Sequence, residues 1–262
     1  MLQSINQKIQ NLPSEKKQFL SLGASTGIVK ALAAFFAFLL TLVVSRYSDA
    51  ATAGQFFYLF NLVSLIAVIA QLGFNISLVK FNAIAFKNQD RTEQSNNYRI
   101  ALVRSLLFSI AACALIYLAF ISFPQQLNTT QVTTFSLAVA LAAIPLLVIG
   151  QTNSRVLQAS RKVIASLVAL QLGVSFLMVV LIVAAKQTLP ITTDTLMALL
   201  LIAAALIALL STLQWVRSGQ YQHGKTAVNR ELSYSAKQVW IGSIFTNLVQ
   251  WGSLVIAGFF VS

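Results

Sequence analysis

Residues 21–44 read SLGASTGIVKALAAFFAFLLTLVV, and this stretch decides the fold. A helix needs about 20 apolar residues to cross the ~30 Å hydrocarbon core of a bilayer. The stretch is long enough and carries one charged side chain, Lys30. We therefore predict a membrane-spanning helix, and the same criterion finds six more. The seven predicted spans are residues 21–44, 56–73, 101–123, 133–151, 163–185, 195–216 and 239–260.

The composition of the chain agrees with several spans. Of its 262 residues, 57% are hydrophobic and 9% are charged, whereas soluble domains carry about 25% charged residues. The mean hydropathy is +0.78. A soluble fold of this size could not cover its surface with so few charges, which argues against a water-soluble enzyme or nucleic-acid binder. We predict an all-α polytopic membrane protein with about seven transmembrane helices.

The basic residues alternate between the connecting segments and set the orientation. Of the 18 Lys and Arg residues, 15 lie in the amino-terminal segment and in the links after the second, fourth and sixth spans. The opposite side has only Arg46 and Lys186, and Lys30 lies within the first span. Because cytoplasmic loops are rich in Lys and Arg, we predict a cytoplasmic amino terminus. Topology then accounts for the net charge of +12, and no nucleic-acid partner is implied.

Few side chains are suited to catalysis or metal binding. The chain has one Cys, one His and six acidic residues, none of which lies inside an apolar run except Cys113. We predict no catalytic residue, metal site or cofactor, and we read Cys113 as a small buried hydrophobe. Pro145 lies inside the fourth predicted span. A proline there frees a backbone carbonyl, which needs protein or water nearby.

The spans divide the chain into four regions. We predict a cytoplasmic leader at 1–20, a six-helix lobe at 21–216, a basic cytoplasmic loop at 217–238 and a seventh transmembrane helix at 239–262. A short amphipathic helix and a disordered polar segment both fit the leader. An odd number of spans would leave the carboxyl end on the outer side, so we expect a sequence truncated after its first lobe.

Short motifs flank the first, second and seventh spans. They are Gly23-Ala24-Ser25-Thr26-Gly27 before Lys30, Arg46 after the first span, Gly54 before Phe56, Leu72-Gly73-Phe74 at the end of the second span, and Asn247-Leu248-Val249-Gln250-Trp251-Gly252-Ser253-Leu254. In these motifs the chain resembles the polysaccharide exporters of the multidrug/oligosaccharidyl-lipid/polysaccharide exporter superfamily. Many members carry Asp where this chain has Ser253, which argues against a charge-coupled role at that position.

The resemblance implies a flippase that moves lipid-linked O-antigen, capsule or exopolysaccharide units across the bacterial inner membrane. Members of the family have two lobes, with a cavity lined by the first, second, seventh and eighth spans. This chain would supply one six-helix lobe and the first helix of a second lobe. The implied partners are a lipid-linked oligosaccharide, membrane lipids, the missing second lobe and other polysaccharide assembly proteins.

Five polar residues are candidates for substrate binding. Lys30 could offset the desolvation of a diphosphate in the cavity, or it could snorkel to the inner headgroups. Arg46 could guard the outer mouth of the cavity or anchor the first span in the headgroups. Asn61, Gln71 and Gln250 could line a hydrated sugar site or form hydrogen bonds between helices.

Two rival functions stay open. A cation-coupled exporter of drugs or small molecules would need a carboxylate within the membrane, and no acidic residue lies at the middle of a predicted span. A non-transporting fragment or assembly subunit would agree with missing second-lobe spans. The pattern favours translocation of polyprenyl-diphosphate-linked oligosaccharides by alternating access.

Overall fold

The computed structural model describes residues 14–123, 132–219, 221–222 and 229–260, without the side chains of 14–22, 170, 247–248 and 250–260. Throughout these ranges the regular elements are helical. They are α2 (Ser14–Tyr47), α3 (Ala50–Ala70), α4 (Phe74–Lys87), α5 (Arg91–Ser122), α7 (Thr134–Ala159), α8 (Val163–Leu167), the π-helical segment η1 (Val168–Leu172), α9 (Gly173–Ala185), α10 (Thr193–Arg217) and α11 (Arg230–Phe260).

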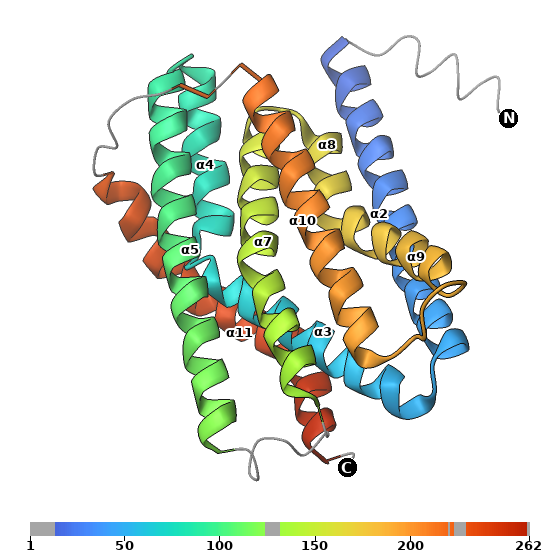
Figure 1. Ribbon diagram of the computed structural model, residues 1–262. Helices are drawn as coiled ribbons and strands as arrows, with labels where there is room; N and C mark the ends of the chain where they lie inside the picture. Colours follow the sequence, from blue (N-terminus) through green and yellow to red (C-terminus); the bar gives the residue numbers. More distant parts are fainter. Residues whose placement is uncertain (1–13, 124–131, 220, 223–228, 261–262) are drawn as a thin grey trace, which may run out of the picture.

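The helices run alternately up and down through one bundle (Figure 1). The start of α2 and the connections α4–α5, α7–α8 and α10–α11 lie at one end, at the top of the view. The connections α2–α3 and α9–α10 lie toward the other end. The alternation that the charge pattern requires is therefore present, and the ends that carry most of the basic residues come together.

Within the described residues, five helices are long and apolar enough to span a membrane: Gly23–Tyr47, Ala50–Ala70, Arg91–Ser122, Thr134–Ala159 and Thr193–Arg217. The predicted span 163–185 is a continuous helical stretch formed by α8, η1 and α9, of which Gly173–Ala185 is a shorter apolar helix. The predicted seventh span falls within α11. The chain is thus an all-helical, multi-pass membrane protein, as predicted.

Several helices extend beyond the predicted spans at the basic end. Sequence analysis treated residues 74–100 as a connection, whereas they form α4 and the first turns of α5. The reason is visible in the spacing of Phe74, Leu78 and Ala85, which are buried on α4 and recur at helical intervals. In the same way, α11 begins at Arg230, nine residues before the span predicted from hydropathy.

Two clusters of buried side chains hold the bundle together. The larger one is built mainly from α3, α7, α9 and α10 and includes Phe56, Ile144 and Met178, which are fully buried. The smaller one lies toward the basic end, where Tyr98 and Trp215 pack with Leu232 and neighbouring residues. Because Leu232 belongs to α11, this second cluster joins the last helix to the preceding six-helix unit.

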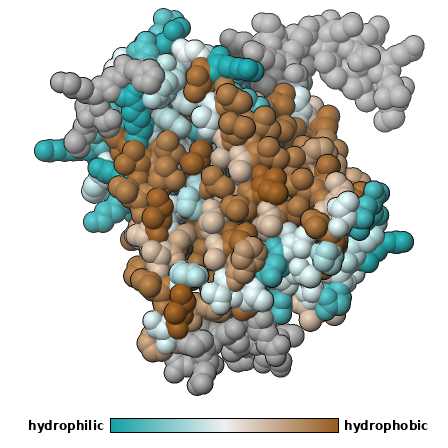
Figure 2. Space-filling view, in the orientation of Figure 1, coloured by the Kyte–Doolittle hydropathy of each residue, from teal (hydrophilic) through white to brown (hydrophobic). Residues whose placement is uncertain are grey.

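The outer surface of the bundle is suited to lipid. Figure 2 shows a broad apolar band across the middle of the molecule, with hydrophilic residues toward its upper end and at its sides. Only 11% of the apolar window in α5 is buried inside the bundle, and side chains such as Leu107 and Leu115 are exposed there. In water such a surface would promote aggregation, whereas in a bilayer it faces acyl chains.

Candidate functional site

Helix α11 crosses the break between α3 and α4 at very close range. Gly73 separates these two helices and has a left-handed backbone with φ of 78°. A Cβ atom there would lie 2.1 Å from the carbonyl oxygen of Ala236 and 2.8 Å from the backbone nitrogen of Trp240. Glycine is required for both reasons, because it adopts positive φ at little cost and leaves room for the α11 backbone.

Five side-chain hydrogen bonds accompany this close approach, and we call the contact the α11 seam. The bonds join Trp240 Nε1 to Ile69 O (2.9 Å), Ser77 Oγ to Ser235 Oγ (3.2 Å), Asn75 Nδ2 to Ser243 Oγ (3.3 Å), Arg104 Nη1 to Ser233 Oγ (2.8 Å) and Asn229 Nδ2 to Asn97 Oδ1 (2.9 Å). None of the five joins two charged groups. The seam is therefore specific in geometry and modest in strength.

Lys30 lies in the first span on a side of α2 that no other described helix covers. Its side chain is exposed, whereas the neighbouring Val29 is buried. Within the described residues the candidate span begins at Gly23, and a rise of ~1.5 Å per residue places Lys30 about 10 Å beyond that residue. An ammonium group at this depth costs several kcal/mol in hydrocarbon, and water or an anion beside it would remove that cost.

Arg46 lies at the opposite end of α2, in its last turn, and is exposed. The next residue, Tyr47, accepts a hydrogen bond from Lys186 Nζ at 2.7 Å. The Lys186 ammonium also lies 4.2 Å from the centre of the Tyr47 ring. This end of the bundle therefore has two cations and an aromatic side chain, which suit either a headgroup anchor or an electropositive mouth.

Two of the other candidates, Asn61 on α3 and Gln71 at its carboxyl-terminal cap, have buried side chains. Asn61 is 8% exposed and Gln71 is 4% exposed. Gln71 donates a hydrogen bond from Nε2 to Oε1 of Gln151 on α7, which is the inter-helical alternative considered for it. Gln250 falls in α11, and its side chain lies outside the described residues.

The described part of the chain does not gather these candidates around one cavity. Lys30 and Arg46 are separated by sixteen residues of α2, which corresponds to about 24 Å along the helix. Helix α2 packs mainly against α8, η1 and α9, whereas α3 packs mainly against α7 and α11. A role in substrate binding stays a prediction for all five residues.

The acidic side chains that the structure describes lie at helix amino termini or in first turns. Asp49 and Asp90 cap α3 and α5, and Glu93, Asp194 and Glu231 lie in the first turns of α5, α10 and α11. Carboxylates are favoured there by the free N–H groups and the helix dipole. Hydrogen bonds from Thr52 lower the pKa of the Asp49 carboxyl from its ordinary value. These positions are explained by helix capping.

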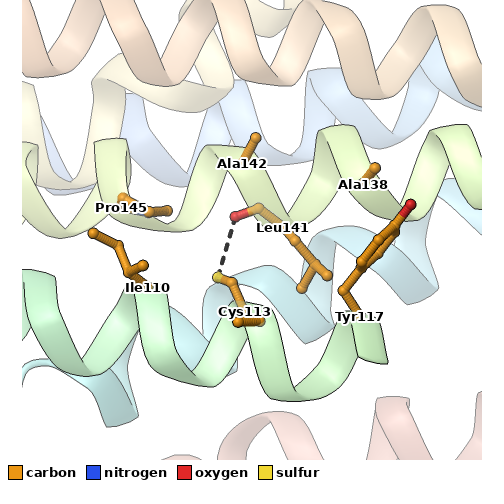
Figure 3. Close-up of a pocket in the computed structure, with 8 residues that line it drawn as sticks. Ile110, Cys113, Tyr117, Ala138, Leu141, Ala142 and Pro145 are labelled. Atoms are coloured by element: carbon orange, nitrogen blue, oxygen red, sulfur yellow. Dashed lines mark hydrogen bonds between the residues drawn. The ribbon is translucent and has the colours of Figure 1, made fainter. Parts of the chain in front are cut away.

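A membrane-exposed groove lies between α5 and α7 (Figure 3). It has a volume of about 320 Å³ and is lined almost wholly by apolar side chains, including Tyr117 and Pro145. At its centre, Cys113 Sγ donates a hydrogen bond to the carbonyl oxygen of Leu141 at 3.4 Å. Leu141 precedes Pro145 by four residues, so this is the carbonyl that the proline frees. Cys113 is thus half-buried and has a specific bonding role.

Sequence reasoning missed the α11 seam and the hydrogen bond that Cys113 donates to the carbonyl freed by Pro145. Gly73 was noted only as part of a family motif, and its position after the apolar run could have indicated a left-handed break. The small residues Ser233 and Ala236 lie three residues apart, which puts them on one face of a helix, and they could have indicated close packing of helices. No local signal links Cys113 to Leu141, because the two residues lie on different helices.

Comparison with known proteins identifies solved structures with a similar fold. No known family profile matches the sequence, and no curated protein matches it. Solved structures do match. A MOP superfamily transporter from Pyrococcus furiosus aligns with a TM-score of 0.70 and 19% identity, covering 89% of this chain and 53% of that protein. A MATE protein in complex with Br-NRF aligns with a TM-score of 0.67 and 19% identity, covering 90% and 55%.

A third match is a multidrug resistance MATE family transporter of the MOP superfamily in an outward-facing conformation. It aligns with a TM-score of 0.66 and 19% identity, covering 89% of this chain and 53% of that protein. The chain therefore has the fold of MOP superfamily transporters over most of its length and spans about half the length of these relatives.

Proposed function

We propose that this chain is the first lobe, with one helix of the second, of an alternating-access transporter for polyprenyl-diphosphate-linked oligosaccharides in the bacterial inner membrane. The observation that carries the proposal is the fold, which follows MOP superfamily transporters over 89% of the chain and half of theirs. The motifs around Arg46, Gly54 and Gly73 support the oligosaccharide class by resemblance. No reaction chemistry is required, since flipping moves an intact substrate.

Lys30 supports an anionic substrate. It lies on α2 about 10 Å beyond Gly23, and its ammonium group has no acidic partner among the described residues. A substrate diphosphate would stabilise this charge, and the cation would in turn offset the cost of bringing phosphate into a medium of low dielectric constant. Each partner thus lowers the cost of placing the other inside the membrane.

The α11 seam supports alternating access. By the family resemblance, α11 begins the second lobe, and the seam attaches it to α3, α4 and α5 between the start of α11 and the α3–α4 break. Four hydrogen bonds between neutral groups, one exposed bond from Arg104 to Ser233 and one small-residue contact at Gly73 can be broken at modest cost. We infer that the seam closes the cytoplasmic side in one state and separates in the other.

Export of small molecules is a second candidate. Two of the solved relatives are MATE proteins, one of them described as a multidrug resistance transporter. The distribution of acids weighs against cation coupling through the described part of this lobe, because its carboxylates lie at helix ends rather than in the middle of spans. An uncharged coupling mechanism would be needed.

Complementation distinguishes the candidates. The full-length gene, including the second lobe that the proposal requires, is expressed in a strain lacking its oligosaccharide flippase, and surface polysaccharide is measured. Restoration supports the proposal. If the protein reaches the membrane and polysaccharide does not return, oligosaccharide flipping is wrong, and a drug-susceptibility assay in an efflux-deficient strain then tests the second candidate. Inactivity in both assays would favour a non-transporting subunit.

Lys30 is tested in the same strain. Lys30→Ala should lower export about 10- to 100-fold, the value of a hydrogen bond to a charged group of about 1.5–3 kcal/mol. Lys30→Arg should keep most of the activity, because it keeps the charge. Lys237→Ala removes an exposed cation at the start of α11 and serves as the control. Normal export by Lys30→Ala at equal protein levels would remove Lys30 from the substrate site.

A further inference from the structure

A polar cavity of about 720 Å³ lies at the basic end of the bundle, between the α4–α5 turn and the α7–α8 turn. Three cationic side chains line it, those of Lys87, Arg91 and Arg161. Its size is typical of ligand pockets in proteins. The seam and the candidate residues on α2 and α3 do not contribute to its lining, so it is separate from the proposed translocation site.

We propose that this cavity binds a phosphate-bearing anion, and specifically the headgroup of an anionic membrane phospholipid. Three positive charges converge there from two turns that are about seventy residues apart in the sequence. Among the residues that the structure describes, no acidic side chain lines the cavity. Asp90, the carboxylate next to Arg91, is engaged as the cap of α5, where its Oδ1 accepts a hydrogen bond from Glu93 N at 2.8 Å.

The three cations have no internal partner in the part of the chain that the structure describes. No hydrogen bond or ion pair involves the side chain of Lys87, Arg91 or Arg161, and all three are exposed. Like charges gathered in one cavity repel one another. An anion bound among them would relieve this repulsion and supply the missing partners, as basic pockets between transmembrane helices do for lipid headgroups.

The backbone of both turns points to the same conclusion. Gln89 and Arg161 adopt left-handed conformations, with φ of 57° and 61°. Each follows a helix whose end is closed by a bond across five residues, from Asp90 N to Ala85 O (2.9 Å) and from Lys162 N to Leu157 O (3.0 Å). Glycine is the usual residue at this position, because other side chains are strained there.

Both turns therefore keep a long polar side chain at a position where glycine would adopt the left-handed backbone with less strain. Both of these side chains line the cavity. The chain does use glycine at another left-handed turn, Gly219, where φ is 71° and nothing lies within 4 Å of a Cβ position. Strained residues cluster at binding sites, and two of the three non-glycine residues with positive φ in the described ranges line this cavity, the third being Leu72 beside Gly73. Gln89 and Arg161 are accounted for if they contact the anion.

The remaining wall of the cavity favours a lipid over a free phosphate. Ala83, Phe86 and Ala159 provide apolar surface beside the three cations. Ile84, which follows Ala83 on α4, is 49% exposed. Acyl chains could lie along this face of α4 while the headgroup occupies the cavity, an arrangement that a free phosphate would not use.

The binding experiment uses the full chain, purified in an uncharged detergent and stripped of lipid. Dioctanoyl phosphatidylglycerol is titrated and compared with dioctanoyl phosphatidylcholine and with inorganic pyrophosphate. The variant Lys87→Gln/Arg91→Gln/Arg161→Gln should bind phosphatidylglycerol about a hundredfold more weakly, at about fivefold for each cation near an anionic surface. The variant Lys87→Arg/Arg91→Lys/Arg161→Lys keeps the charges and should stay within about threefold of the parent.

A matched control removes the same charge elsewhere. Arg217, Arg230 and Lys237 are exposed near the same end of the bundle and do not line the cavity. The variant Arg217→Gln/Arg230→Gln/Lys237→Gln should bind like the parent. If it loses as much affinity as the cavity variant, or if the cavity variant binds like the parent, the site does not exist. Tight binding of pyrophosphate with no preference for the lipid would keep the anion site and overturn its lipid occupant.

A glycine variant separates binding from folding. Arg161→Gly removes one cation and relieves the left-handed strain, so it should raise the melting temperature by about 2 to 4 °C while weakening phosphatidylglycerol binding about fivefold. Arg161→Ala weakens binding to the same extent and keeps the strain. A more stable protein with unchanged affinity would show that Arg161 has no part in the site.

Discussion

The α11 seam should be opened by adding one methyl group at Gly73. A Cβ atom at this position would lie 2.1 Å from Ala236 O and 2.8 Å from Trp240 N. Ordinary contacts of a Cβ atom are 3.4–4 Å long. In Gly73→Ala, α11 must therefore move away from the α3–α4 break by about one ångström, because the atoms that oppose the methyl group belong to its backbone.

The magnitude follows from the contacts nearest to Gly73. The bonds from Trp240 to Ile69 and from Ser77 to Ser235 would lengthen beyond useful range, at about 0.6 kcal/mol each. Packing around Ala236, which is 1% exposed, would lose about one buried methyl group, or ~0.8 kcal/mol. We expect a loss of about 2 kcal/mol, which reduces the ratio of closed to open seam about thirtyfold.

Cysteine cross-linking measures the closed state directly. Ser77 Oγ and Ser235 Oγ are 3.2 Å apart, so cysteines at these two positions place their sulfur atoms within reach of a disulfide. Cys113 is the only native cysteine, and Cys113→Ala supplies a clean background. Under mild oxidation the Ser77→Cys/Ser235→Cys protein should cross-link rapidly. The addition of Gly73→Ala should slow the reaction, because the rate follows the fraction of closed seam, and the slowing reaches about thirtyfold where the open state predominates.

Two glycine controls isolate the steric effect. Gly219→Ala has the same kind of left-handed strain, with φ of 71° and nothing within 4 Å. Gly54→Ala adds a methyl group in α3 with open space around it, where alanine also favours the helix. Neither should change the cross-linking rate. If Gly73→Ala cross-links as fast as these controls, α11 does not pack on the break between α3 and α4 as described.

Two stability predictions follow from paired polar groups within the membrane. Cys113→Ala should lower the free energy of unfolding by about 1 kcal/mol, measured by thermal melting in detergent. In a Pro145→Ala background the same change should cost almost nothing, because residue 145 regains an N–H that bonds to the Leu141 carbonyl. Equal losses in both backgrounds would contradict the bond. Gln71→Leu should lower the free energy of unfolding by about 1–3 kcal/mol, because it leaves the Gln151 amide unpaired. Adding Gln151→Leu should recover most of this loss. Additive losses would show that the two amides are independent.

The sequence predicts the architecture well because hydropathy and charge act locally. An apolar run such as residues 21–44 is expected to cross the bilayer whatever its neighbours in the fold are. The orientation follows from the excess of basic residues in alternate links, which can be counted without knowing how the helices pack. The helix around Pro145 was predicted, and so was the need of a freed carbonyl for a partner. The partner itself was not, since Cys113 reaches it only through the packing of α5 on α7.

The candidate site was harder to predict because it depends on which helices meet. Lys30 was selected because placing its charged side chain in hydrocarbon costs free energy, which depends on that residue alone. In the structure its side chain is exposed. Gln71 was selected by the same rule but is satisfied within the lobe by Gln151. The seam at Gly73 arises between segments more than 160 residues apart, so no window of sequence shows it.

The strength of the α11 seam matches what a moving contact requires. Its five side-chain bonds, at about 0.6 kcal/mol each, contribute about 3 kcal/mol in a membrane. To convert a seam that is closed 99% of the time into one that is open 99% of the time, a substrate must prefer the open state by about 5.5 kcal/mol. Buried ion pairs would raise that requirement, since breaking one leaves an uncompensated charge in a medium of low dielectric constant. The seam instead uses serine, asparagine and tryptophan side chains and one arginine, whose bond to Ser233 is exposed rather than buried. Closed over one glycine, it keeps both states within reach of the binding energy of a single ligand.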